Sequence, residues 1–113
     1  MRARSTAPHE LPQRAPIRLA AGEPVMVGDR DTEWPEFLFV TCAHGSGWVP
    51  ARHLSADRGA AVVETDYDTT ELAVAADEEV TVIDRDDVSG WWWCRSDEGG
   101  EGWVPARNFK AGA

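Results

Sequence analysis

The chain has 113 residues, six of them Trp, and a net charge of -9 at pH 7. That length allows one ordinary domain or two very small ones, and it leaves no room for a deep cofactor cavity. The acidic excess lies in residues 57–113, with fourteen acidic and five basic side chains, whereas residues 1–56 carry six of each. Such a balance opposes binding to nucleic acid, which needs clusters of Lys and Arg.

The same acidity opposes binding to an anionic membrane, and it suits either a basic partner or simple solubility. No apolar run follows Arg2 and Arg4, and no stretch reaches the length of a membrane span. We therefore expect a cytoplasmic protein with no membrane contact.

Residues 1–15 are rich in Arg, Pro, Ala and Ser, with Pro8, Pro12 and Pro16 spaced four apart. Prolines at that spacing interrupt a helix and favour extended chain. The sequence predicts an extended or disordered arm, with the fold beginning near Pro16. The arm's Arg14 and prolines raise the possibility that it occupies an acidic groove of the protein.

A tandem repeat follows the arm. The string Gly-Trp-Val-Pro-Ala-Arg occurs at residues 47–52 and again at 102–107, and a gapless shift of 55 positions makes fifteen of 38 aligned pairs identical. Repeats of this kind are single structural units used more than once. We predict two units, residues 16–55 and residues 61–110, separated by a turn around Asp57, Arg58 and Gly59.

The sequence predicts short strands in both units, and neither unit shows helical periodicity. Apolar residues alternate or run briefly between turn formers, as in small all-β folds. The expected strands are 25–27, 37–42 and 48–49 in the first unit, and 61–64, 79–84, 91–95 and 102–104 in the second. Pro50 and Pro105 end the last strand of each unit because proline lacks a backbone donor.

Cysteine and histidine give no catalytic or metal motif. In the gapless alignment Cys42 pairs with Asp97 and Cys94 with the core-type Phe39. We expect Cys94 to be buried and Cys42 to be a free thiol near a turn. His9, His44 and His53 have no nucleophile or carboxylate beside them at a recognisable spacing. The sequence thus predicts no enzyme, no cofactor and no metal site.

The second unit resembles an SH3 domain. Val63 to Tyr67 stands where that family has Ala-Leu-Tyr-Asp-Tyr, and Glu71 to Val74 matches the Glu-Leu-Ser-Phe element. Trp91-Trp92 matches the paired tryptophans, and residues 102–105 match Gly-Tyr-Ile-Pro. The first unit is similar to looser bacterial SH3-like units, although Trp91 aligns there with Glu36. The resemblance implies two tandem SH3-like small β-barrels packed together.

The resemblance also implies a peptide site. SH3 domains bind proline-rich peptides in an aromatic groove between acidic loops. Carried over residue by residue, the groove consists of Tyr67, Trp91, Pro105 and Asn108, of which Asn108 stands where the family has a tyrosine. The acidic residues of the two flanking loops are Asp68, Glu71, Asp86 and Asp87.

Three kinds of function remain open at this point. The first is a non-catalytic module that binds a basic or proline-containing segment of a partner. The second is a structural or assembly protein whose Trp surfaces are buried between the repeats or in a homodimer. The third is an accessory subunit of a larger complex, an enzyme, that has no activity alone.

Overall fold

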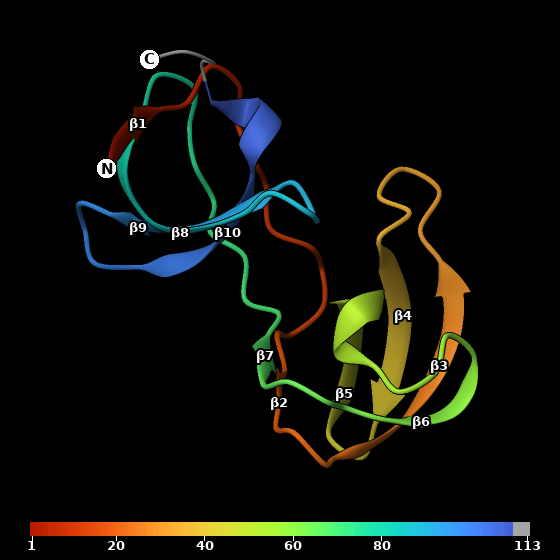
Figure 1. Cartoon of the computed structure of the whole chain (residues 1–113). Coiled ribbons are helices and arrows are strands. Elements are labelled where there is room, and N and C mark those ends of the chain that lie inside the picture. The colour runs from red at the N-terminus through yellow and green to blue at the C-terminus, as the bar shows by residue number, and fades with distance from the viewer. Residues whose placement is uncertain (110–113) are drawn as a thin grey trace. The chain divides into compact units, whose positions relative to one another are not determined.

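The computed structural model describes residues 1–109 and is all-β, with two short 3₁₀ helices (Figure 1). Residue 110, the last of the second predicted unit, lies outside the described residues. In chain order the strands are β1 (Arg2–Arg4), β2 (Arg18–Leu19), β3 (Pro24–Arg30), β4 (Phe37–Cys42), β5 (Gly45–Pro50), β6 (Gly59–Val62), β7 (Tyr67–Asp68), β8 (Glu79–Asp86), β9 (Trp91–Ser96) and β10 (Glu101–Pro105). The 3₁₀ helices, η1 (Ala51–His53) and η2 (Ala106–Asn108), each follow the proline that ends a strand.

The chain forms two compact units, Arg14–Thr69 and a second one made of Met1–Gln13 together with Thr70–Ala113. The first contains a four-stranded antiparallel sheet in the order β5-β4-β3-β6, and the second contains a sheet in the order β10-β9-β8-β1. The strand orders correspond, as the sequence repeat predicts. Neither sheet closes on itself in the described residues.

Residues 1–13 belong to the second unit, and Arg2–Arg4 form a strand of its sheet, which the sequence did not predict. In β1, Ala3 pairs with Val80 and is buried, while Arg2 and Arg4 on either side are exposed. This alternation of a small buried residue with exposed ones is that of a strand with one face on the core. Beyond β1, Ser5 bridges Phe109 and His9 bridges Val74. Residues 2–4 of the predicted arm are therefore the edge strand of a sheet.

The segment that follows η1 supplies the edge strand of the other sheet, in the unit Arg14–Thr69. β6 pairs with β3, and then Val63 bridges Leu54 while Tyr67 pairs with Leu19. These pairings correspond one by one to those of residues 3–9, with Tyr67 in the place of His9. The segment that the sequence assigned to the start of the second unit thus completes the unit Arg14–Thr69, so the predicted domain boundaries differ from the structural ones.

Strand register also corrects the gapless alignment. Phe37 pairs with Pro50 and Trp91 pairs with Pro105, so Trp91 takes the place of Phe37 and not of Glu36. The shift is therefore 54 positions in β4 and β9, and an extra turn residue between β9 and β10 restores it to 55. By the same register Cys94 takes the place of the buried Val40, and Cys42 takes that of Ser96.

Each sheet packs its own apolar core. The unit Arg14–Thr69 buries ten aliphatic residues: Ile17, Leu19, Val25, Val27, Leu38, Val40, Val49, Leu54, Ala61 and Val63. The other unit buries Ala3, Val74, Val80, Val82, Cys94, Val104 and Phe109. Cys94 is buried as predicted, and this burial raises the pKa of its thiol to about 12 because the thiolate would lose its hydration.

Candidate functional site

Tyr67 is held at the edge of the unit Arg14–Thr69 by a two-stranded ladder. Leu19 in β2 pairs with Tyr67 in β7, and Arg18 pairs with Asp68. The Tyr67 ring contacts the His53 ring edge to face, with centroids 5.1 Å apart, and packs against the aliphatic core. The strand therefore fixes the ring while leaving it half-buried.

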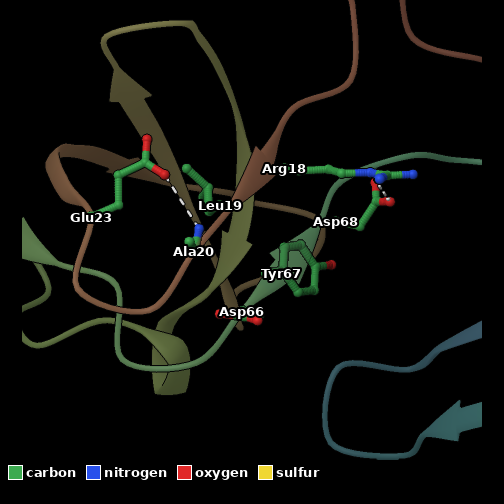
Figure 2. Close-up of a pocket in the computed structure, with 7 residues that line it drawn as sticks. All are labelled: Arg18, Leu19, Ala20, Glu23, Asp66, Tyr67 and Asp68. Atoms are coloured by element: carbon green, nitrogen blue, oxygen red, sulfur yellow. Dashed lines mark hydrogen bonds and ion pairs between the residues drawn. The ribbon is translucent and has the colours of Figure 1, made fainter.

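An open pocket of about 460 Å³ lies around this ring (Figure 2). The residues that line it come from β2, the turn before β3 and the segment that leads into β7. They are Arg18, Leu19, Ala20, Glu23, Asp66, Tyr67 and Asp68. Three of the seven are acidic and one is basic, so the lining carries an excess of negative charge.

Each carboxylate in the pocket has a defined hydrogen bond. Asp66 Oδ1 accepts from the backbone N–H of Ala21 at 2.7 Å, and Glu23 Oε1 accepts from that of Ala20 at 3.3 Å. The pKa of Glu23 is lowered by that backbone bond first and by the neighbouring His44 second. Asp68 Oδ2 accepts from Arg18 Nε at 3.1 Å. These bonds orient the acidic groups before any ligand arrives.

The other unit carries a second aromatic surface around Trp91. The Trp91 ring contacts the His9 ring edge to face at 5.4 Å, and His9 Nε2 lies 2.8 Å from Glu71 Oε1. His9 therefore stands beside Trp91 in this unit, in the place that the sequence resemblance gave to Tyr67.

The eight predicted site residues are thus divided between the units. Tyr67 and Asp68 belong to Arg14–Thr69, whereas the six others belong to the unit that contains residues 70–109: Glu71, Asp86, Asp87, Trp91, Pro105 and Asn108. The resemblance had placed all eight around one groove.

Some of those six residues have structural contacts of their own. Asp86 Oδ1 accepts from the backbone N–H groups of Val88 and Ser89, which closes the turn between β8 and β9. Asn108 is buried and donates from Nδ2 to the carbonyl of Pro8 at 3.2 Å. Pro105 is buried at the end of β10, while Asp87 is exposed. Asn108 therefore anchors the N-terminal segment.

Sequence reasoning missed Glu23, Arg18 and His9 as neighbours of the aromatic residues. The position of His9 could have been found, because Ser5 to His9 lies shortly before the first repeat as Val63 to Tyr67 lies shortly before the second. It was missed because the SH3 family has a tyrosine at this position, and only the second segment has one. Glu23 is repeated as Glu78 in the second unit, and the sequence assigned neither residue to a site.

Among the described residues, one group of side chains has the composition of a metal site. One ligand atom each from Glu23, Cys42 and His44 lies within 4.8 Å of the others. The sequence gave no reason to connect these three positions, because Glu23 lies far along the chain from Cys42 and His44. Cys42 was expected to be a free thiol near a turn.

Residues 62–110 match the family model of the variant SH3 domain. An SH3 domain suggests a protein-interaction module, which agrees with the aromatic and acidic pocket. No curated protein and no solved structure matches the chain.

The limits of that SH3 match do not coincide with the structural units. Its residues 62–69 belong to Arg14–Thr69, and the rest of its described part belongs to the other unit. The described residues contain no helix that is long and apolar enough to span a membrane.

Proposed function

We propose that the protein is a non-catalytic interaction module that binds a basic, proline-containing segment of a partner protein at the Tyr67 pocket. We further propose that the chain is a tandem pair of SH3-like units. The observation that carries the proposal is that Glu23, Asp66 and Asp68 line one pocket together with Tyr67.

The pocket's chemistry suits an arginine side chain. A guanidinium group donates paired hydrogen bonds to carboxylates, and charge-assisted bonds of this type are stronger than neutral ones. Its flat face also packs on aromatic rings. Asp66 and Asp68 supply the carboxylates and Tyr67 supplies the ring.

The intramolecular contact of Arg18 with Asp68 is of the type that we propose for a ligand arginine. Its guanidinium bonds Asp68, yet its side chain is 87% exposed. An exposed ion pair contributes only about 0–1 kcal/mol, so a ligand arginine displaces Arg18 at little cost.

A proline next to the ligand arginine adds affinity by lowering the entropy cost of binding. An extended proline-rich segment loses little conformational entropy on binding, and aromatic rings are its usual contact. A shallow pocket with one ring supports micromolar affinity, or about -8 kcal/mol.

The absence of catalysis is part of the proposal. The histidines of the two His–Glu pairs, His9 with Glu71 and His44 with Glu23, contact carboxylates and not a serine or threonine hydroxyl in the described residues. Such pairs serve equally as structural bonds.

Calorimetric titration of the full protein with an arginine-containing, proline-rich peptide tests the binding proposal. The double variant Asp66→Asn, Asp68→Asn keeps an oxygen to accept the Ala21 N–H bond but loses both charges. We expect its affinity to fall by at least about tenfold, which is about 1.4 kcal/mol. Asp87→Asn, an exposed acidic residue of the other unit, is the matched control and should bind as the wild type does.

Equal affinity of the wild type and the double variant would refute the pocket as the binding site. No binding at all, together with a homodimer in sedimentation, would favour the assembly role over the peptide-binding one. The peptide with arginine replaced by alanine completes the design, since it should bind both proteins equally weakly.

A further inference from the structure

Glu23, Cys42 and His44 bring three different metal-binding groups to one end of the sheet β5-β4-β3-β6. Glu23 precedes β3, Cys42 ends β4, and His44 lies in the turn to β5. Because Met26 in β3 pairs with Thr41 in β4, the start of β3 and the end of β4 lie side by side. The fold, and not the sequence spacing alone, therefore brings the carboxylate to the thiol and the imidazole.

The distances are close to those of a coordination shell. The three ligand atoms lie within 4.8 Å of one another, and His44 Nε2 is 2.6 Å from Glu23 Oε2. Zinc bonds these atom types at about 2.0–2.3 Å, which in a tetrahedron spaces the ligand atoms roughly 3.3–3.8 Å apart. Side-chain shifts on the order of 1 Å would suffice to enclose an ion.

The other hairpin shows that the fold does not require these residue types. Glu78 repeats the turn bond of Glu23, with Oε1 accepting from the N–H of Ala75 at 3.0 Å. In the place of Cys42 that hairpin has Ser96, and its turn of Asp97, Glu98 and Gly99 contains no histidine. Glu23 Oε1 therefore accepts the turn bond, while Oε2 lies 2.6 Å from Nε2 of His44, a residue type that the turn does not need.

The cluster is also open to solvent. The side chain of His44 is 47% exposed and that of Glu23 is 22% exposed, and Cys42 is half-buried. An ion can reach all three groups without local unfolding. The second thiol, Cys94, lies in the core of the other unit and does not compete.

We propose that Glu23, Cys42 and His44 bind a zinc-class divalent cation, with water in the fourth position. A thiolate, an imidazole and a carboxylate together select a borderline-soft ion such as Zn²⁺ or Co²⁺ over Mg²⁺ or Ca²⁺, which prefer oxygen ligands. Binding requires the thiolate, so the thiol proton is released to solvent as the metal–sulfur bond forms. The proposal does not depend on peptide binding.

Titration of the full, reduced protein with Co²⁺, followed by absorption spectroscopy, tests the site. A cobalt–thiolate bond gives a charge-transfer band that carboxylate or imidazole ligands alone do not give. We expect this band in the wild type, its loss in Cys42→Ser, and its removal when Zn²⁺ is added. Cys42→Ser installs the residue that the other hairpin already has, so the fold should be retained.

Two further variants separate a built site from a reactive thiol. His44→Ala alters an exposed turn residue, and Glu23→Gln keeps an oxygen for the turn bond, so both should fold and both should bind Co²⁺ more weakly. Glu78→Gln is the matched control and should leave the titration unchanged. A band of equal strength in His44→Ala and Glu23→Gln, or no band in the wild type, would overturn the proposal.

Discussion

At the scale of single residues, the duplication gave equivalent positions different chemistry. Cys94 and Val40 are both fully buried, so a thiol and an isopropyl group fill the same place in the two cores. Cys42 occupies the position of Ser96 at the end of the equivalent strand, where it is half-buried. One cysteine thus acts as a hydrophobic residue and the other as an accessible thiol.

This difference predicts selective thiol chemistry. The pKa of Cys94 is raised to about 12 by burial, and a protonated thiol is a poor nucleophile. In the native protein near neutral pH, we expect one thiol, Cys42, to react with an aromatic disulfide reagent, and we expect two to react after unfolding. Two equally fast thiols in the native state would contradict the burial of Cys94.

The ion pair between Arg2 and Asp97 predicts a pH dependence of stability. Arg2 donates from Nη1 to Asp97 Oδ1 at 2.8 Å, and this bond, followed by the guanidinium charge, lowers the pKa of Asp97. A lowered folded pKa means that the stabilisation is present above the ordinary pKa of about 3.9 and is lost as pH falls through the folded value.

Asp97→Asn checks this sign. We expect the variant to be less stable than the wild type above about pH 4, and the difference in the free energy of unfolding should shrink as the solution is acidified further. Urea denaturation at several pH values measures it. A difference that stays constant with pH would show that Arg2 and Asp97 are not coupled in solution.

At the scale of elements, the repeated Gly-Trp-Val-Pro strand packs differently in the two units. A Cβ on Gly102 would lie 2.5 Å from the backbone carbonyl carbon of Glu71, whereas one on Gly47 would meet the side chain of Thr69 at 3.3 Å. Backbone atoms cannot move aside as a side-chain methyl group can. A side chain at position 102 would therefore clash with backbone, whereas one at position 47 would need only a small shift of Thr69.

The pair of variants Gly102→Ala and Gly47→Ala measures this difference. We expect Gly102→Ala to lower the free energy of unfolding by about 1–3 kcal/mol, the usual cost of overpacking, and Gly47→Ala to lower it by less. Denaturant unfolding followed by Trp fluorescence gives both values. An equal effect would mean that Glu71 does not approach β10 in solution.

Sequence alone predicted the all-β class and the positions of most strands, because the alternation and the turn residues are local signals. It did not predict the one-residue shift between β4 and β9. Between Asp31 and Gly45 the two repeats share no identical pair, so nothing in that stretch opposed a gapless alignment. The consequence was the wrong partner for Trp91 and for both cysteines.

At the scale of the whole molecule, the assignment of edge strands could not be predicted from local pattern. β3 and β8 each need an edge strand, and the patterns of residues 2–9 and 60–67 fit either of them. The family match over residues 62–110 favours pairing of residues 60–67 with β8, which would keep each unit continuous in sequence. In the structure, Ser5 N–H instead donates to the Glu78 carbonyl at 2.8 Å, and Val63 N–H donates to the Glu23 carbonyl at 2.9 Å. These long-range bonds decide which unit each segment completes.

Deletion of residues 1–13 tests the assignment. It would leave β8 without an edge partner and remove Ala3 from the core. In the backbone NMR spectrum, we expect residues 70–109 to lose their native dispersion while residues 14–69 keep theirs. Retention of native shifts across residues 62–109, with loss in residues 14–54, would show the sequence-continuous arrangement instead.

An amide NMR titration of the full protein with a basic, proline-containing peptide tests whether the Tyr67 pocket binds such segments, as we propose. We expect shifts at the pocket residues that saturate near the micromolar range, namely at Arg18, Ala20, Asp66, Tyr67 and Asp68. Shifts confined to Trp91 and its neighbours, or no shifts at all, would contradict the proposal.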